Sequence, residues 1–384
     1  MNSAATSAAP GGLVRDLSIP AIAAGFLAVL ISYSGPLIIF FQAAQQAQVS
    51  PTMMISWIWG ISIGAAVAGI FLSIKFKVPV ITAWSAPGTA LLVTLFPNIS
   101  LNEAVAAYIT SAVVIFLIGI SGYFDKLLKW IPQSVAAGMM AGILFQFGLG
   151  LFSATNSMPI IVFSMLFVFL VAKRISPRYS MLWVLLSGVA LSFGLGEMNA
   201  VSLDVQLAIP QFISPEWTWH STLNLALPLI LVSLTGQFLP GMAIMKLSGY
   251  DMPAKPIITT TSIASLAVAC VGGITIVLAS ITAALCMGKD AHELKEKRYI
   301  AGVANGIFYI LGGLFAGSIV LLFSLLPKEL VAALAGLALL GAISTNIAVA
   351  MKDESQRDSA LITFLATASG MHFLGLSSVL DRKS

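Results

Sequence analysis

The chain has 384 residues, of which 58% are hydrophobic and only 9% are charged, whereas an ordinary soluble domain carries about 25% charged residues. This composition excludes a soluble globular protein. A membrane-spanning helix takes about 20 apolar residues, so the length allows roughly 13 or 14 spans and leaves no room for a separate soluble domain. Continuous apolar runs also exclude a porin, whose strands alternate over about 10 residues. The sequence therefore predicts an all-α polytopic membrane protein.

The net charge of +4 arises from 19 Lys and Arg against 15 Asp and Glu. These basic residues are scattered between the apolar runs and form no single basic face, which argues against a nucleic-acid partner. Cys270 and Cys286 fall inside apolar runs, where a thiol behaves as a small buried hydrophobe. Residues 1–14 are small and polar without a basic start, so we expect a disordered tail and no cleaved signal peptide.

Apolar runs bounded by charge or by Pro, Gly and Asn predict thirteen spans in chain order. The first seven lie near 19–41, 52–74, 79–96, 103–122, 132–152, 157–173 and 179–195. A polar connection, 196–221, follows them. The other six lie near 222–247, 256–272, 274–288, 299–318, 328–350 and 357–374. The apolar stretch that follows is too short to span a membrane, so either a fourteenth span is truncated or the thirteenth runs out to Leu380.

The distribution of Lys and Arg predicts the orientation of these spans. With a cytoplasmic N-terminus, sixteen of the nineteen Lys and Arg fall in cytoplasmic loops. The 196–221 connection carries Glu197, Asp204 and Glu216 but no Lys or Arg. Because cytoplasmic loops are enriched in basic residues, the N-terminus is predicted to be cytoplasmic and 196–221 extracytoplasmic.

The two halves of the chain share unusual residues at a fixed offset of 195. Helix breakers and intramembrane polar residues coincide, which chance matches of Leu and Ala would not produce. The matched pairs are Gln42 with Gln237, Ser85 with Ser280, Gly122 with Gly317, and Pro132 with Pro327. Seven spans separate the copies, so the second is inverted. A 7+7 inverted repeat is the plan of secondary transporters, which bind substrate near the membrane midplane.

The third predicted span is too irregular to be one continuous helix. Pro79 and the β-branched residues 80–82 precede Ser85 and Pro87. This order predicts an extended piece and then an N-capped helix that begins near Ala86. The alternative is that the prolines only kink a continuous span.

The tenth predicted span repeats this plan with Gly272 and Gly273, a β-branched run and Ser280 before a helix-forming tail. Extended backbone at membrane depth must be buried in protein or line a cavity. We expect the two extended pieces to pair and to aim two helix N-termini at one central site, whose N–H groups suit an anion such as a carboxylate. The alternative is that Ser85 and Ser280 only bond back to carbonyls.

A few intramembrane polar and aromatic residues are further candidates for the site. Gln237, between Gly236 and Pro240, is expected to line it, although glutamine also joins helices, the role expected for Gln42. Tyr33 presents a hydroxyl and a ring mid-span, and Trp84 presents a ring. For both, packing in the core is the alternative.

No predicted span carries Asp, Glu, Lys or Arg near its centre, although proton-coupled carriers often use one. The proton-coupling residue is therefore unknown. His372 is a weak candidate in the last segment, where a lone histidine more often packs. Motifs of membrane proteases and hydrolases are absent, so we expect no enzyme, no metal site and no cofactor.

The stretch 79–92, PVITAWSAPGTALL, closely resembles the bacterial benzoate/proton symporter family, whose signature is Pro-Val-x-Thr-Ala-Trp-Ser-x-Pro-Gly. The resemblance extends in register through 26–42, 136–152, 237–250, 279–286 and 366–370. It implies the fold of nucleobase/ascorbate transporters and sulfate permeases, with core and gate domains. The implied core is 15–122 and 222–318, and the implied gate is 123–195 and 319–384.

The resemblance implies import of benzoate or a similar aromatic carboxylate with a proton across the bacterial inner membrane, by alternating access. Dimers through the gate are common in similar folds, and the oligomeric state stays open. The carboxylate would meet two helix starts, and the ring would meet apolar walls. The implied residues are Ser85, Ala86, Gly88, Ser280, Ile281 and Thr282 for the carboxylate, and Tyr33, Trp84 and Phe238 for the ring. Neutral Gln237 replaces a glutamate of nucleobase relatives, which leaves the proton route open. Alternatives are a carrier for another small organic anion or a nucleobase, and an anion channel.

Overall fold

The computed structural model describes residues 12–13, 15–96, 98–197, 207–369, 372–373 and 376–377. Within these residues, six helices are long and apolar enough to cross a membrane. A helix pair, Lys295–Leu314 and Ala316–Ser324, is bent by 69° at the break between them and is either a seventh, broken span or a re-entrant loop. Every one of the thirteen predicted segments contains a helix, and several are shorter than a full span because they are broken.

The first half of the chain begins with a span broken at Gly35, where Pro36 starts a second helix. The elements are α1 (Ile19–Ser34), α2 (Pro36–Gln46), α3 (Pro51–Phe76), β1 (Thr82–Trp84), α4 (Ala86–Leu95), α5 (Leu101–Ser121), α6 (Phe124–Trp130), α7 (Gln133–Ser153), η1 (Ala154–Asn156), α8 (Pro159–Ile175), η2 (Pro177–Tyr179) and α9 (Ser180–Gly194).

The second half begins with one continuous helix, Trp219–Leu247, that contains two π-helical turns. Its parts are α10 (Trp219–Ser221), η3 (Thr222–Ala226), α11 (Leu227–Ser233), η4 (Leu234–Phe238) and α12 (Leu239–Leu247). There follow α13 (Ala254–Ala269), β2 (Ile276–Leu278), α14 (Ile281–Met287), η5 (Lys295–Lys297), α15 (Tyr299–Leu314), α16 (Ala316–Ser324), α17 (Lys328–Ala350), η6 (Glu354–Gln356), α18 (Arg357–Ser369), β3 (His372–Phe373) and β4 (Leu376–Ser377).

The last helix ends earlier than the predicted segment 357–374. Helix α18 ends at Ser369, and His372 lies in β3, which pairs antiparallel with β4. Apolar content alone does not distinguish a short strand from a helix end, so the segment was placed too far along the chain. His372 is therefore not inside a membrane-spanning helix. Most of the stretch expected to hold a truncated last span lies outside the described residues.

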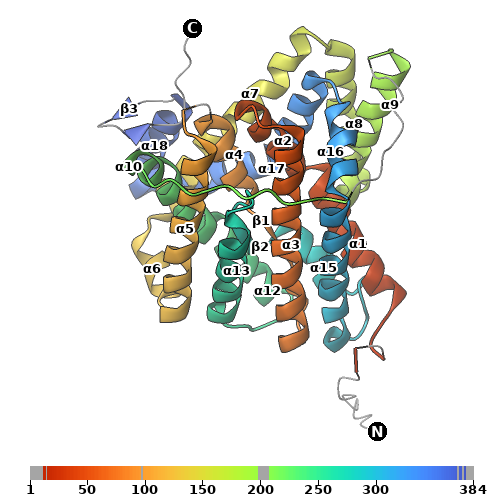
Figure 1. The fold of residues 1–384 in the computed structure, drawn as a ribbon, viewed down its shortest axis with the longest axis vertical. Helices are drawn as coiled ribbons and strands as arrows, with labels where there is room; N and C mark the ends of the chain where they lie inside the picture. Colours follow the sequence, from red (N-terminus) through yellow and green to blue (C-terminus); the bar gives the residue numbers. More distant parts are fainter. Residues whose placement is uncertain are drawn as a thin grey trace.

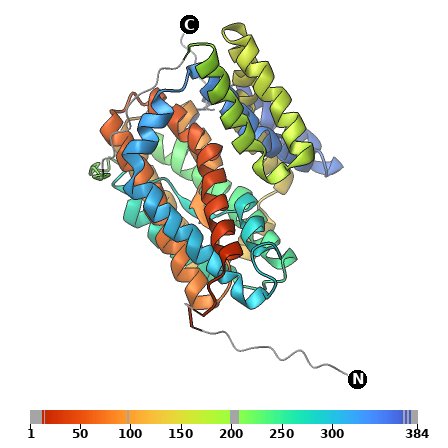
Figure 2. The same ribbon diagram turned by 90° about the vertical axis from the view of Figure 1, so that its right-hand side faces the viewer.

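The helices pack as two bundles (Figures 1 and 2). In the larger bundle, α15 packs against α1 and α3, and α13 packs against α3 and α5. In the smaller bundle, α7 packs against α17 and α18, and α8 packs against α9. The bundles meet where α4 touches α7, α2 touches α17 and α1 touches α9.

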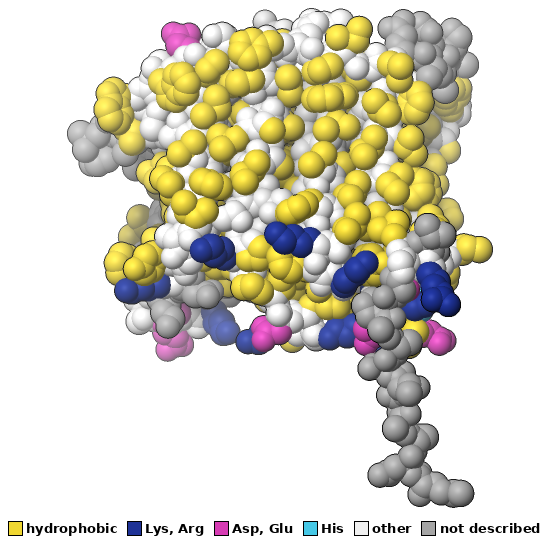
Figure 3. Space-filling model, turned by 60° about the horizontal axis from the view of Figure 1, so that its bottom comes forward, with side chains coloured by type: hydrophobic (Ala, Val, Ile, Leu, Met, Phe, Trp, Pro, Cys, Tyr) yellow, Lys and Arg dark blue, Asp and Glu magenta, His cyan; other side chains and the backbone are white. Residues whose placement is uncertain are grey.

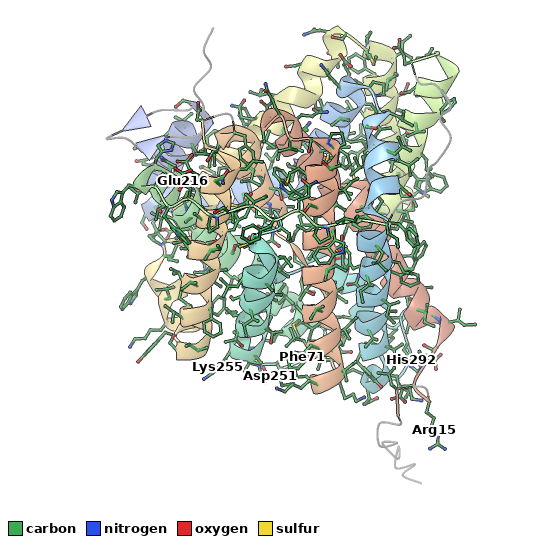
Figure 4. All side chains as sticks on the ribbon, viewed as in Figure 1. Arg15, Phe71, Glu216, Asp251, Lys255 and His292 are labelled. Atoms are coloured by element: carbon green, nitrogen blue, oxygen red, sulfur yellow. The ribbon has the colours of Figure 1, made fainter. Side chains whose placement is uncertain are left out.

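Charged side chains mark one end of the molecule, which we call the basic end. Lys and Arg gather along this end, with hydrophobic side chains covering the surface above it (Figure 3). Arg15, Asp251, Lys255 and His292 all lie there, whereas Glu216 lies toward the opposite end (Figure 4). This pattern is typical of a protein whose apolar belt faces lipid.

Candidate functional site

The centre of the larger bundle is built around the two broken spans. Strands β1 and β2 pair antiparallel, with Thr82 opposite Leu278 and Trp84 opposite Ile276. The ladder continues at both ends, because Ser85 N donates to Thr275 O at 3.0 Å and Ala279 N donates to Ile81 O at 2.9 Å. The expected extended pieces and their pairing are thus confirmed.

Neighbouring helices satisfy the strand backbone and side chains at membrane depth. Thr82 Oγ1 donates to the Ala65 carbonyl of α3 at 2.6 Å, and Ile276 N donates to Ser265 Oγ of α13 at 2.8 Å. Gly69 of α3 allows this approach, since a Cβ there would lie 2.8 Å from Thr82 Oγ1. Buried polar groups need such partners. The β1–β2 ribbon is therefore held in place by α3 and α13.

The start of α4 is largely occupied by its own cap. Ser85 Oγ accepts a hydrogen bond from Gly88 N at 3.1 Å, and Pro87 has no N–H to offer. The N–H of half-buried Ala86 is the other donor of this first turn, and the cap does not use it. Gly88 is a packing position, because a Cβ there would lie 2.8 Å from Leu229 Cδ2. An anion at this end would therefore meet Ala86 more readily than Gly88.

The start of α14 differs from that of α4. Ser280 is half-buried and its side chain makes no capping hydrogen bond, while Thr282 is buried. The side chain of Ile281 lies outside the described part of the chain. In the observed register the strand backbone that leads into α14 ends at Ala279, whose N–H bonds to Ile81 O, four residues before Ser85. The starts of α4 and α14 therefore lie at opposite ends of the paired strands. A single site shared by both starts stays a prediction.

Three aromatic rings meet beside β1. Trp84 stacks on Tyr33 with ring centroids 6.0 Å apart, and Tyr309 of α15 lies edge-on to both, at 6.0 Å and 5.8 Å. The Tyr33 hydroxyl lies 2.7 Å from Ser62 Oγ. Trp84 is 3% exposed, and its indole Nε1 is buried with no hydrogen-bond partner among the described residues. An unsatisfied buried donor is costly.

The two candidates of the eighth span occupy different environments. Gln237 lies in the π-helical turn η4 and is half-buried, and neighbouring Gly236 faces Met140 of α7, whose Cε would be 3.1 Å from an added Cβ. π-helical turns often mark functional sites. Phe238 is 1% exposed and packs edge-on against Phe124, with centroids 6.5 Å apart, in a different buried cluster from Trp84. Phe238 therefore packs in a different cluster from Trp84, and its role as a wall of the site stays a prediction.

A small cavity of about 110 Å³ lies where the two bundles meet. Gln42 of α2, Thr94 of α4 and Gln146 of α7 are its polar lining residues. Gln146 Nε2 donates to the Ala368 carbonyl of α18 at 3.0 Å. Gln42 was expected to join helices, and it lies on this boundary between the bundles.

Sequence reasoning missed Tyr309, Ser62 and Met140. None carries a local signal, because each reaches the site only through packing of distant helices. The π-helical turn around Gln237 was also missed, although Gly236 and Pro240 beside it are its local signal. Among the described residues, no group of His, Cys, Asp and Glu could hold a metal ion.

This arrangement, two broken spans paired at the centre of an apolar helical protein, defines a membrane transporter fold. The transmembrane domain of the cyanobacterium bicarbonate transporter BicA has the same fold, with a TM-score of 0.60 and 13% identity over 92% of this chain and 97% of that one. At this identity the likeness concerns the fold alone.

Residues 15–381 match the family described as benzoate membrane transport protein. The Benzoate membrane transport protein of Acinetobacter baylyi (strain ATCC 33305 / BD413 / ADP1) is 79% identical over 367 residues, 96% of this chain and 93% of the relative. Inner membrane protein YdcO of Escherichia coli (strain K12) is 38% identical over 359 residues, 94% of this chain and 92% of the relative. The chain belongs to the benzoate membrane transport protein family.

Proposed function

We propose that this transporter imports benzoate or a similar aromatic carboxylate, together with a proton, by alternating access. The family and the name of the relative from Acinetobacter baylyi support the substrate. The observation that supports an aromatic carboxylate is the environment of Trp84. Its ring stacks on Tyr33, and the indole N–H of the same side chain has no partner among the described residues. An apolar ring with one anionic group fits such a site.

The bound carboxylate would accept hydrogen bonds from Trp84 Nε1 and from the N–H of Ala86 at the start of α4. The partial positive charge of a helix start favours an anion there. The ring of the substrate would pack against Tyr33 and Trp84, with Gln237 on the side of the smaller bundle. The start of α14, with Ser280, Ile281 and Thr282, is the alternative anchor at the other end of the ribbon.

Alternating access would move the larger bundle, as the core, against the smaller bundle, as the gate. The contacts of α4 with α7 and of α2 with α17 surround the cavity at Gln42, whereas α14 packs on α1, α12 and α15 within the larger bundle. This asymmetry supports a state closed at the end away from the basic end. The core and gate keep the boundaries 15–122 with 222–318 and 123–195 with 319–384.

The proposed location is the bacterial inner membrane, with the N-terminus and the basic end in the cytoplasm. The positive-inside rule and the name of the relative from Escherichia coli support this. Proton coupling and a homodimer rest on the resemblance to symporters. No residue is assigned to the proton, since His372 lies beyond α18.

The test is competition for radiolabelled benzoate bound to the purified protein in detergent. We expect unlabelled benzoate to displace the label, and cyclohexanecarboxylate to compete more weakly because its ring cannot stack. Uracil and bicarbonate should not compete. Displacement by uracil or bicarbonate with no benzoate binding would favour a nucleobase or small-anion carrier. Single-channel currents in planar bilayers would favour the channel.

A further inference from the structure

An extended segment, residues 207–218, crosses the front of the larger bundle, and we call it the strap (Figure 1). Its backbone is bonded to four helices or their ends. Ala208 N donates to the Leu314 carbonyl of α15 at 2.9 Å, and Ile213 N donates to the Cys270 carbonyl after α13 at 2.7 Å. The strap therefore has a fixed position on the bundle.

Further bonds attach the strap to α3 and α5. Gln211 N donates to Ser56 Oγ of α3 at 2.7 Å, and Glu216 N donates to the Asn102 carbonyl of α5 at 3.0 Å. Trp217 Nε1 donates to Thr110 Oγ1 of α5 at 3.2 Å. These bonds join helices from both halves of the chain.

The strap exposes large apolar and aromatic side chains, together with Gln211, Ser214 and Glu216. Ile209 is 79% exposed, Phe212 is 72% exposed, and Trp219, directly after the strap, is 82% exposed. Leu207 and Trp217 are also exposed. Residues 207–219 contain no Lys or Arg. Neighbouring exposed apolar side chains of this kind mark an interaction surface.

The exposed apolar side chains of the strap continue the lipid-facing stripes of the helices beneath it. On α5, Val113, Leu117 and Ile120 are exposed, and the first of them is one helical turn from Thr110, which holds Trp217. On the α15–α16 side, Ile307, Leu311 and Phe315 are exposed around Leu314, which holds Ala208. The surface below the strap is therefore continuous with the surface that the strap exposes.

The depth of the strap follows from helix geometry. Ser56, which bonds to the strap, and Lys75, at the basic end of the same helix, are separated by about 28 Å at 1.5 Å per residue. The hydrocarbon core of a bilayer is about 30 Å thick. With Lys75 at one boundary of the hydrocarbon, the strap lies at the other.

We propose that the strap binds the headgroup and upper acyl region of the lipid leaflet away from the basic end. Trp side chains favour this interface, where a ring meets lipid and the indole N–H meets a polar partner. Trp217 has this arrangement, with Thr110 as the partner. The proposal does not depend on the identity of the transported substrate.

The test is tryptophan quenching in proteoliposomes made with phosphatidylcholine brominated at carbons 6 and 7, or at carbons 11 and 12. The signal of the strap is the emission lost in the W217F/W219F double variant. Both indoles are exposed and Phe keeps a ring at each position, so only the bond of Trp217 to Thr110 is lost and the backbone bonds of the strap remain. Asp251→Trp, made in that double variant, is the matched control, because Asp251 is exposed in a polar connection at the basic end.

We expect the shallow bromines to quench the strap emission at least about twofold more than the deep ones, and acrylamide to quench it weakly. Acrylamide should quench the control indole strongly, and both bromolipids should quench it weakly. Strap emission quenched by acrylamide as strongly as the control would overturn the proposal, since the strap would face water. Emission shielded from acrylamide and from both bromolipids would also overturn it, because a second copy of the chain would then cover the strap.

Discussion

At the scale of single residues, Trp84 connects the strand, the helix start and the aromatic cluster. It ends β1, directly precedes the cap of α4 and stacks on Tyr33, while its N–H has no partner. The local sequence predicted the cap at Ser85 and the helix start at Ala86, because serine before proline is a local signal. Tyr309 completes the aromatic cluster from 225 residues away in the chain, and no local pattern predicts that contact.

Replacing Trp84 by Phe keeps an aromatic ring and removes the indole N–H. Because a hydrogen bond to a charged group contributes about 1.5–3 kcal/mol, we expect the Kd of benzoate to rise roughly tenfold or more. Isothermal titration calorimetry of the purified protein measures it. Tyr33→Phe is the matched control: it loses only the contact with Ser62, so stability should fall by about 1 kcal/mol with little change in Kd.

Ser280→Ala distinguishes the two ends of the ribbon. With the carboxylate at α4, this variant should bind benzoate as tightly as the unmodified protein. A loss of affinity in Ser280→Ala as large as in Trp84→Phe would place the carboxylate at α14 and contradict the assignment to α4.

At the scale of elements, the antiparallel ribbon is the feature that the sequence predicted best. β-Branched runs followed by serine in matched positions of the two halves, after Pro79 in one and after Gly272 and Gly273 in the other, predicted both extended pieces and both helix starts. The separation of the two starts was not predicted, because it depends on the register of the pairing and not on either strand alone. The inverted repeat that led to this pairing stays a prediction.

An ion pair between two connections is a second feature of this scale. Arg178, in η2 between α8 and α9, pairs with Asp290, in the connection after α14. These connections belong to the smaller and the larger bundle. If the bundles move against each other during transport, this contact has to open and close in each cycle.

Reversing one charge of this pair should slow transport, and reversing both should restore it. An exposed ion pair contributes at most about 1 kcal/mol, so we expect Arg178→Glu or Asp290→Lys to lower the initial uptake rate by at most about fivefold. The Arg178→Glu/Asp290→Lys double variant should return to the original rate. If the double variant is as slow as either single variant, the pair does not couple the two connections.

At the scale of the whole molecule, composition and the spacing of apolar runs predicted thirteen segments that all contain helices. Residue-level patterns could not predict that the helices divide into two bundles, since this depends on which apolar faces meet. The strap was expected only as a polar connection, because an extended segment without a short period carries no signal of where it packs.

The orientation of the molecule is testable by labelling with a membrane-impermeant maleimide. We expect Glu197→Cys to react in intact spheroplasts, because Glu197 is exposed in the connection after α9 that is predicted to be extracytoplasmic. Asp251→Cys should react only after permeabilisation, because Asp251 lies at the basic end (Figure 4). The native Cys270 and Cys286 are half-buried and buried, and the unsubstituted protein is the control. Labelling of Asp251→Cys in intact spheroplasts would reverse the proposed orientation.

The most direct test of the central claim is uptake of radiolabelled benzoate into proteoliposomes with an acidic exterior. Protein-free vesicles under the same gradient are the baseline, because protonated benzoic acid crosses bare lipid. The account predicts saturable accumulation above this baseline, lost when a protonophore collapses the gradient and reduced in Trp84→Phe at limiting benzoate. Uptake by the protein that equals the baseline at every benzoate concentration would contradict it.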